Sequence, residues 1–381
     1  MSYEVAIIGT GSDPSKRTRD GFSMGYRHAG AYAEHPDCSI TACADVSREN
    51  ADRFANTFNI SDDGVFEHHS ELIANATPDI VSVCVPPSAH ADIVLDCAQA
   101  ASIQAIHCEK PMAPTWSDCQ EMVETCEQAG VQLTIDHQRR FSKPVVNAAA
   151  LIDDGAIGDL RRMEWSEVNL FDAGSHLFDL CDHFVSGSDP TWVLAAVDAT
   201  VDRRWFGTRN SDQAIAHWEY ENGVQGLAST SDGDHGTAID PYLRLVGTDG
   251  EIEIDPPTDA ALRMRTDGGW KTIDTNGEAL YGPSPSLVDS ALAKVASVAP
   301  VIDSPGLKRL NYARAIDHVV ESLQSGTDPI ISGRAALRSA QLIFGCWESA
   351  RQGQRISFPL ELTDDPLAEL ATRAASETTH A

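Results

Sequence analysis

The stretch YEVAIIGTG, residues 3–11, joins a short apolar run to a glycine-rich turn. The run is rich in β-branched and aliphatic residues, as buried strands are, and the turn is Gly9-Thr10-Gly11. A strand that ends in such a turn is typical of the phosphate-binding start of a dinucleotide-binding unit. The alternative is a glycine turn that binds no ligand.

An insertion follows this turn. The usual third glycine of the fingerprint would stand at residue 14, which is Pro14, and a helical pattern resumes only around Gly25. Moving the third glycine to Gly25 implies an insertion of about eleven residues within Ser12 to Met24. The insertion carries a basic cluster, Lys16, Arg17 and Arg19. This cluster could close over a pyrophosphate or meet a 2′-phosphate, or it could be a mobile surface loop.

A second strand is expected at 39–44, and Asp45 follows it at once. An acidic residue at this place accepts hydrogen bonds from the adenosine ribose and repels a 2′-phosphate, which favours NAD over NADP. Arg48 keeps NADP possible, because a guanidinium can bind a phosphate. Asp45 could instead, or in addition, cap a helix that begins near Ser47.

Further apolar runs at 79–85, 103–108 and 131–135 alternate with helical segments. Strands that alternate with helices predict a parallel, right-handed, doubly wound sheet. We therefore expect an α/β fold that begins with a Rossmann domain over residues 1–137. Prolines and His90 follow the 79–85 strand, in a stiff loop that could lie along a nicotinamide ribose.

After residue 137 the pattern changes to longer alternating runs. They lie at 193–201, 213–221, 223–231, 242–247 and 251–254. Such runs between turn residues predict a C-terminal α/β domain, residues 138–360, with an open, mainly antiparallel sheet. Helices expected at 312–324 and 334–351 would cover one face of that sheet. Residues 361–381 are polar and acidic and are expected to form a loose tail.

Glu109-Lys110-Pro111 follows the 103–108 strand. Ligands of open parallel sheets bind outside the carboxyl ends of the strands, so a lysine held there by a proline is a candidate catalytic residue. The alternative is a solvated loop, in which Glu-Lys-Pro also occurs by chance.

Asp172 and His176 are four residues apart and would share one face of a helix. A carboxylate can orient an imidazole and stabilise its protonated form, which suits a general acid/base. Alternatives are a helix start capped by Asp172, a solvated acidic face, and a metal site. The metal site would use His176, Asp179, Asp182 and His183. Because His183 is adjacent to Asp182, the two side chains would point apart, and no metal site is expected.

The composition of the 381 residues bounds the class of protein. The net charge is −29, and lysine is scarce, with 6 lysines against 22 arginines. An acidic surface poor in lysine suits a protein that stays hydrated in very high salt, so we expect a halophile; the alternative is an ordinary acidic protein. Nucleic-acid and anionic-membrane binding are disfavoured. Nine cysteines without a CxxC pair indicate reduced thiols in a cytoplasm, and no signal peptide or membrane-spanning run is apparent.

Taken in order, these motifs are similar to those of the Gfo/Idh/MocA oxidoreductases, which include glucose-fructose oxidoreductase and inositol and xylose dehydrogenases. The resemblance extends to Pro359. The matching motifs are Gly9-Thr10-Gly11, Gly25-Tyr26-Arg27-His28-Ala29 with Tyr32, Asp45, Val85-Pro86-Pro87 with His90, Glu109-Lys110-Pro111, Arg140-Phe141, Asp172-x-Gly174-x-His176-x-x-Asp179, Gly247-Thr248-x-Gly250, Ser332-Gly333-Arg334-Ala335-Ala336-Leu337 and Ser349-Ala350-x-x-Gly353.

The resemblance implies NAD or NADP as cofactor and an open sheet that builds homodimers or homotetramers. Lys110 resembles the family's catalytic lysine, and Asp172 and His176 its acid/base pair. Cofactor contacts are expected from Gly9, Thr10, Gly11, Asp45, Arg48, Val85, Pro87, His90, Glu109 and Lys110. Substrate contacts are expected from His137, Arg140, Asp172 and His176. The segment from Trp165 to Asp172 is shorter than in many sugar dehydrogenases of the family, which leaves the substrate open.

We expect a hydride transfer between a nicotinamide cofactor and a hydroxyl or carbonyl carbon of a sugar, polyol or related small molecule. One alternative keeps NAD bound and eliminates or hydrolyses a glycosidic bond through transient oxidation. Others are a non-catalytic NAD-binding regulatory protein and a metal-dependent hydrolase or isomerase.

Overall fold

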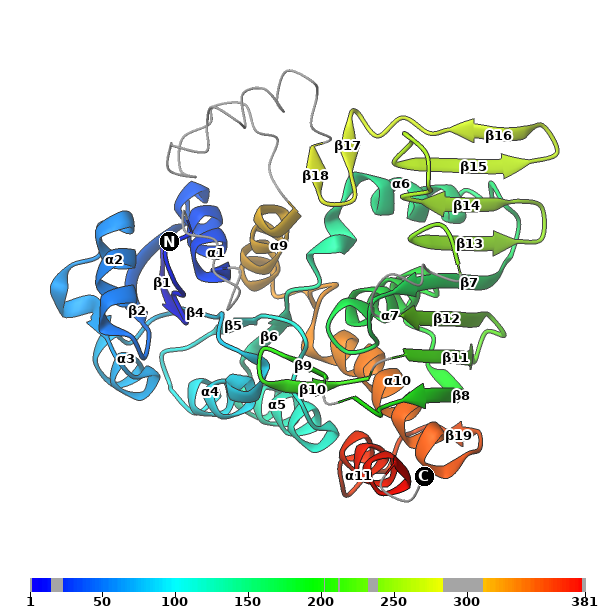
Figure 1. The fold of residues 1–381 in the computed structure, drawn as a ribbon. Coiled ribbons are helices and arrows are strands. Elements are labelled where there is room, and N and C mark those ends of the chain that lie inside the picture. The colour runs from blue at the N-terminus through cyan, green and yellow to red at the C-terminus, as the bar shows by residue number, and fades with distance from the viewer. Residues whose placement is uncertain are drawn as a thin grey trace. The chain divides into compact units, whose positions relative to one another are not determined.

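The structure is a computed structural model that describes residues 2–14, 23–201, 203–211, 213–231, 239–283 and 311–378 (Figure 1). The basic cluster Lys16, Arg17 and Arg19 lies outside these residues, so its role stays a prediction. The chain forms two compact units. The first comprises Met1–Ala113, Gln120–Gln138 and Gly282–Gly333, and the second Pro114–Cys119, Arg139–Tyr281 and Arg334–Ala381.

The described strands of the first unit form a parallel six-stranded sheet in the order β3-β2-β1-β4-β5-β6. Its main strands are β1 (Tyr3–Ile8), β2 (Cys38–Ala44), β3 (Val65–Phe66), β4 (Ile80–Val83), β5 (Ala105–Cys108) and β6 (Gln132–Ile135). This is the doubly wound order of a dinucleotide-binding sheet. It confirms the predicted Rossmann domain, and the carboxyl ends of all six strands meet at one edge.

Helices cover this sheet. They are α1 (Met24–Glu34), α2 (Arg48–Phe58), α3 (His69–Ala76), α4 (His90–Ala98), α5 (Trp116–Ala129) and α9 (Asn311–Ser325), with short 3₁₀ turns η1 (Asp62–Gly64), η2 (Pro87–Ala89) and η3 (Gln138–Phe141). One apolar cluster joins β1 and β2 to α1, α2 and α9, and it includes Val5, Tyr32 and Ile316. Those three helices therefore share a layer on one face, while α3 packs beside α4.

The position of α9 corrects one prediction. Residues 312–324 are helical as expected, but the helix does not cover the second sheet. It packs on α1 in the first unit, where Ala313, Ile316 and Val320 are buried and Arg27 lies 5.6 Å from the ring centroid of Tyr312. The apolar stripe of α9 is compatible with either sheet, so its local pattern could not select the partner.

The second unit is built on a nine-stranded mixed sheet in the order β16-β15-β14-β13-β7-β12-β11-β8-β19. Among the described pairs only β7 with β12 is parallel, which confirms the mainly antiparallel prediction. Its strands are β7 (Leu160–Glu167), β8 (Pro190–Asp198), β11 (Gln213–Tyr220), β12 (Gln225–Ser231), β13 (Leu243–Gly247), β14 (Glu251–Ile254), β15 (Leu262–Thr266), β16 (Gly269–Thr272) and β19 (Ile356–Ser357). Short strands outside it are β9 (Arg203–Trp205), β10 (Thr208–Asn210), β17 (Glu278–Ala279) and β18 (Gly282–Pro283).

Helix α7 (Ala173–Phe184) is anchored on this sheet by aromatic packing. Phe178 on α7 contacts Trp165 of β7 and Trp218 of β11, with ring centroids 5.0 and 5.1 Å away. Trp218 in turn lies over its cross-strand neighbour Gly226, where an added Cβ would stand 2.0 Å from the indole. Fully burying each large apolar side chain contributes about 2–3 kcal/mol. This packing holds the helix that carries His176.

The remaining helices of the second unit are α6 (Lys143–Asp153), α10 (Gly333–Gln352) and α11 (Pro366–Thr378). The prediction that 334–351 covers the second sheet is confirmed, because Ser349 of α10 accepts the backbone N–H of Ala195 in β8. The loose-tail prediction for 361–381 is wrong over α11. Arg351 binds Asp364 and Glu369 there, and Leu367 is buried.

None of the helices in the described part of the chain combines the length and apolar character that crossing a bilayer requires. All nine cysteines lie within the described residues, and each is a free thiol.

Candidate active site

The glycine turn after β1 is shaped by close backbone contacts. Gly9 and Gly11 have φ of +87° and +74°, values that favour glycine. A Cβ on Gly9 would stand 2.7 Å from the carbonyl carbon of Cys84, after β4, and a Cβ on Gly25 would stand 2.7 Å from the oxygen of Gly9. Gly25 therefore provides the close helix–strand packing of a third fingerprint glycine, as the sequence predicts for it.

Asp45, after β2, holds this turn. Its Oδ2 accepts hydrogen bonds from the backbone N–H of Gly11, at 2.9 Å, and from the Thr10 hydroxyl, at 3.0 Å. Its Oδ1 accepts the backbone N–H of Ser47 at 2.9 Å. The N-cap of α2 is Ser47, whose hydroxyl accepts the N–H of Asn50. Asp45 therefore supports the helix start only indirectly, and its partly exposed carboxylate stays at the sheet edge where a ribose would lie.

Arg48 is engaged by other groups of its own unit. Its Nε donates to Asp52 at 2.7 Å and its Nη1 to the carbonyl of Val65 at 3.3 Å. The hydrogen bond to Asp52 raises the pKa of the Arg48 guanidinium. A 2′-phosphate would have to compete with these partners for the guanidinium. The contacts of Arg48 therefore weaken the argument for NADP that the sequence alone offers.

His90 ties two loops of the sheet edge together. Its Nε2 lies 2.9 Å from the carbonyl of Val85, and its Nδ1 lies 3.0 and 3.1 Å from the carbonyls of Pro111 and Met112. The ring is fully buried, and burial lowers the pKa of His90. Pro87 is also buried. His90 thus fixes the Val85 loop against the turn that carries Lys110, whatever part it takes in cofactor contact.

Lys110 stands directly beyond the carboxyl end of β5. Its backbone N–H donates to Oε2 of Glu109 at 3.1 Å, and the N–H of Glu109 donates to the carbonyl of Val83 in β4 at 2.9 Å. The peptide bond before Pro111 is cis. Glu109 is buried while Lys110 is partly exposed. The turn thus holds the lysine at the edge that also carries the glycine turn and Asp45.

A buried polar cluster beneath this turn was not predicted from the sequence. Nε2 of His28, on α1, lies 3.2 Å from Oε1 of Glu109 and 3.4 Å from Oδ2 of Asp136. Nε2 of His107, on β5, lies 3.6 Å from Oδ1 of Asp136. Although burial disfavours the imidazolium, Cys84, Asp136 and Glu109 raise the pKa of His28 well above its usual value. Burial opposes the ionised Asp136, yet His107 and His28 lower its pKa.

A signal for this cluster exists in the sequence. Ser82, His107 and Thr134 are polar residues inside three apolar strands, and they are direct register neighbours across β4, β5 and β6. Polar residues at one register of a buried parallel sheet need partners on the same face. Only the strand order, which needs the tertiary structure, reveals that they are neighbours.

In the second unit, Asp172 occupies the N-cap position of α7 and His176 lies one turn further on. The capping alternative for the Asp172 side chain does not hold, because it makes no cap hydrogen bond. Asn169 serves instead, accepting the N–H groups of Asp172 and Ala173 at 2.7 and 3.1 Å. The Asp172 carboxylate is partly exposed and His176 is almost fully buried. The acid/base role of Asp172 and His176 stays a prediction.

The metal alternative for this segment fails on the partners of its carboxylates. Arg140 forms a bidentate pair with Asp179, at 2.7 Å for both contacts, and Arg338 donates to Asp182 at 2.9 and 3.1 Å. Burial, with Arg140 next in effect, lowers the pKa of His183 to about 4. Among the described residues the candidate metal cluster lies elsewhere, at His28, His107 and Asp136.

Arg140 and His137 therefore differ in their surroundings. The guanidinium of Arg140 is buried and held by Asp179, which is a structural arrangement; its role as a substrate contact stays a prediction. His137 stands two residues after the end of β6, at the same sheet edge as Lys110, and its role also stays a prediction.

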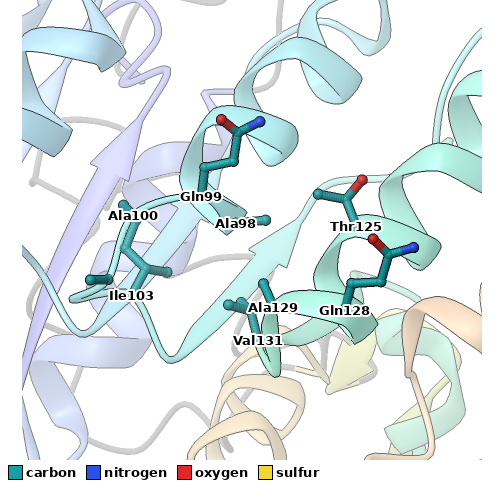
Figure 2. Close-up of a pocket in the computed structure, with 9 residues that line it drawn as sticks. Ala98, Gln99, Ala100, Ile103, Thr125, Gln128, Ala129 and Val131 are labelled. Carbon is teal, nitrogen blue, oxygen red and sulfur yellow. The ribbon is translucent and has the colours of Figure 1, made fainter.

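A pocket in the first unit lies away from this edge (Figure 2). It is lined by residues of α4 and α5 and by Ile103 and Val131, which precede β5 and β6. It lies at the amino ends of β5 and β6, opposite the edge that carries Lys110. It is therefore not the place where a doubly wound sheet binds its dinucleotide.

Comparison with known proteins agrees with this geometry. Residues 4–137 match the family model described as oxidoreductase family, NAD-binding Rossmann fold. Residues 161–358 match the model for the C-terminal alpha/beta domain of the same oxidoreductase family, Gfo/Idh/MocA.

Individual relatives share a low sequence identity with this chain, but over most of its length. A D-apiose dehydrogenase of Paraburkholderia graminis is 25% identical over 375 residues, covering 93% of this chain and 89% of that protein. A 2,7-anhydro-N-acetylneuraminate hydratase of Escherichia coli is 25% identical over 286 residues, covering 68% and 73%. The crystal structure of an oxidoreductase from Agrobacterium radiobacter in complex with NAD⁺, L-tartaric acid and magnesium has a TM-score of 0.71 at 20% identity, covering 94% and 98%.

The parallel sheet with its glycine turn, the mixed sheet behind α7 and both family matches lead to one assignment. The chain belongs to the Gfo/Idh/MocA oxidoreductase family.

Proposed function

We propose that this protein transfers a hydride between a nicotinamide cofactor and a hydroxyl-bearing carbon of a sugar, polyol or related compound. The observation that carries the proposal is the placement of Lys110. It stands at the carboxyl edge of the parallel sheet together with Gly9, Gly11 and Asp45, on adjacent or near strands. A dinucleotide binds at this edge of a doubly wound sheet, and a lysine there can donate a hydrogen bond to the reacting oxygen.

The residues fit a dinucleotide. The positive φ values of Gly9 and Gly11 and the close approach of Gly25 leave backbone, not side chains, at the turn. The start of α1 follows this turn in the chain, and helix starts favour phosphate groups. When bound, a nicotinamide ring accepts or supplies the hydride. Gly9, Thr10 and Gly11 would hold the pyrophosphate, and Val85 and Pro87 would lie along the nicotinamide side.

The chain's own groups would divide the remaining work. His176 would take the hydroxyl proton in oxidation and return it in reduction, since an imidazole titrates near neutrality. Asp172, one turn away, would stabilise the imidazolium. Lys110 would donate a hydrogen bond to the reacting oxygen and stabilise negative charge that develops on it. Polar neighbours such as His137 suit a polyhydroxylated ligand.

We infer that NAD is preferred over NADP. The Asp45 carboxylate accepts hydrogen bonds from Gly11 and Thr10, and beside a bound adenosine ribose it would repel a 2′-phosphate. Arg48, the residue that would favour NADP, is paired with Asp52.

A second candidate keeps NAD bound through the cycle and eliminates or hydrates its substrate by transient oxidation. The hydratase among the relatives favours it, because a hydratase adds or removes water and has no net redox change. It would use the same Lys110 and His176.

A turnover assay tests both candidates. The protein is given aldoses, polyols and inositols with NAD or NADP in molar salt, and the absorbance of the reduced nicotinamide is followed. Formation of NADH with one substrate class supports the dehydrogenase. Silence across the panel with NAD retained through gel filtration supports the second candidate. Silence without any cofactor binding would contradict both.

Three further properties complete the proposal. The charge of −29 with 6 lysines against 22 arginines suits a halophile, and unpaired cysteines suit a cytoplasm.

Leu194 and Ile215 are 46% and 63% exposed on the open face of the second sheet, which supports a homodimer or homotetramer. Light scattering after gel filtration in molar KCl measures the mass, and a monomer there would contradict the oligomer.

A further inference from the structure

The first unit contains three fully buried side chains that converge from three elements. They are His28 of α1, His107 of β5 and Asp136, which follows β6. One ligand atom from each lies within 4.8 Å of the others. His28 Nε2 is 3.4 Å from Oδ2 of Asp136, and His107 Nε2 is 3.6 Å from its Oδ1. Buried groups of this kind need partners or a shared cation.

Hydroxyl groups fix the proton on the far nitrogen of each imidazole. Ser82 Oγ donates to the carbonyl of His107, and it lies 2.8 Å from Nδ1 of His28. An oxygen whose own proton is used in this way accepts, so Nδ1 of His28 carries a hydrogen. Thr134 repeats the arrangement, because its Oγ1 donates to the carbonyl of Ile106 at 3.1 Å and lies 2.9 Å from Nδ1 of His107.

In this tautomer, Nε2 of each ring faces the Asp136 carboxylate with its lone pair. In neutral rings with Nδ1–H, both Nε2 atoms present electron pairs toward Asp136, whereas imidazolium rings would present N–H groups toward Asp136 and Glu109. Among the described residues, the two carboxylate oxygens of Asp136 and Nε2 of His107 have no hydrogen-bond partner. Three electron-rich groups without access to water repel one another unless a metal cation lies between them or the Nε2 atoms are protonated. Second hydrogen bonds that orient histidine rings are also what metal sites use.

The distances suit a small transition-metal ion. Ligands about 2.0–2.2 Å from a tetrahedral Zn²⁺ stand roughly 3.3–3.6 Å from one another. The observed separations from Asp136 to the two imidazoles are 3.4 and 3.6 Å. Oε1 of Glu109 lies 3.2 Å from Nε2 of His28, so a second carboxylate stands beside the cluster. The carboxylates of Asp136 and Glu109 together balance one divalent charge, and imidazole ligands select Zn²⁺ or a similar ion over Mg²⁺ or Ca²⁺.

We propose that His28, His107 and Asp136 bind one divalent transition-metal ion, with Zn²⁺ as the expected occupant. The site is closed, since all three side chains are fully buried, so the ion is structural and holds no substrate. It would join α1, β5 and β6. Glu109, whose Oε1 lies 3.2 Å from Nε2 of His28 and whose other oxygen accepts the N–H of Lys110, would link the site to the turn that carries the lysine.

The first test is the metal content of the wild-type full chain. The protein is expressed without a polyhistidine tag, in medium supplied with Zn²⁺ or Co²⁺, and passed through gel filtration in chelator-treated buffer. Mass spectrometry is expected to find one metal ion per chain. The Co²⁺ form is expected to show the visible absorption of a tetrahedral nitrogen and oxygen site. Protein that carries no retained metal would overturn the proposal, since two protons, one on each Nε2, would then balance the cluster.

Variants locate the ion. His107→Gln and Asp136→Asn are expected to lose the retained metal and the Co²⁺ absorption. His69→Gln is the matched control, because His69 pairs with Asp96 near the surface of the same unit, and it is expected to retain both. Circular dichroism establishes which variants fold, and the wild-type metal content decides the question if neither does. One retained ion that survives both folded variants would place it elsewhere and overturn the assignment.

Discussion

The carboxylate of Asp45 accepts the backbone N–H of Gly11 at 2.9 Å, so the acidic residue after β2 holds the glycine turn after β1. One side chain thus combines a structural contact with the charge that would discriminate between cofactors. The two contributions can be separated by substitution, because an amide retains the acceptor and loses the charge.

Asp45→Asn is expected to shift the ratio of kcat/KM for NAD over NADP toward NADP by about tenfold or more, since one lost charge repulsion corresponds to about 1–2 kcal/mol. Asp45→Ala should also raise KM for both cofactors, because Gly11 loses its acceptor. Steady-state kinetics with each cofactor measure both effects. Glu49→Gln, an exposed acid on α2 paired with Arg53, is the control. An unchanged ratio in Asp45→Asn would show that Asp45 does not read the ribose.

Lys110→Met is expected to lower kcat by about 10²–10³-fold, the usual loss when a donor to a developing oxyanion is removed. Cofactor affinity should change little, because the contacts that hold the turn come from the Glu109 carboxylate and the lysine backbone. Stopped-flow turnover and NAD titration measure the two quantities. Lys143→Met, at the start of α6, is the matched control. Turnover like that of the wild type in Lys110→Met would remove the lysine from the mechanism.

His176→Asn is expected to lower kcat by about 10²–10⁴-fold, as removal of a general base does. The acidic limb of the pH profile should disappear with it, because that limb reports protonation of the base. Asp172→Asn should retain some activity and shift the limb to lower pH, since the imidazolium loses a neighbouring carboxylate. Rates from pH 5 to 9 test this, with His217→Gln on β11 as control. A limb that persists in His176→Asn would assign it to another group.

The pKa of His183 is lowered to about 4 by burial and by Arg140, against about 6.5 in an unfolded chain. Between these values the unfolded chain binds the proton and the folded chain does not, so stability falls as the pH decreases from about 6.5 to 4. The wild type should therefore lose on the order of 1 kcal/mol more than His183→Gln between pH 7.5 and 5. Urea unfolding at both pH values measures the difference. Equal losses in the two proteins would contradict the shift.

Arg140→Met is expected to destabilise the second unit by about 3–5 kcal/mol, because it leaves the buried carboxylate of Asp179 without its bidentate partner. Arg161→Met should cost less than about 0.5 kcal/mol, since Arg161 and Asp159 form an exposed pair. Urea unfolding in a constant salt concentration compares them. If Arg140→Met instead unfolds like the wild type and raises KM for substrate, the arginine contacts the substrate and its structural role is minor.

The local pattern of the sequence was sufficient to predict the parallel sheet. The strand at residues 3–8, the glycine turn after it and the shift of the third glycine to Gly25 follow from side-chain period and from backbone that only glycine adopts easily. Asp45 and Lys110 could be placed for the same reason, because strand ends of a parallel sheet share one edge.

Long-range pairing was decided only by the tertiary structure. An amphipathic helix such as α9 does not encode which sheet it covers, and the acidic segment at 366–378 does not reveal that Arg351 will bind it. The buried cluster of His28, His107 and Asp136 joins residues 28, 107 and 136 of the chain, and no spacing rule relates them. Side-chain period and turn chemistry act over a few residues, whereas the meeting of distant polar groups depends on strand order and packing.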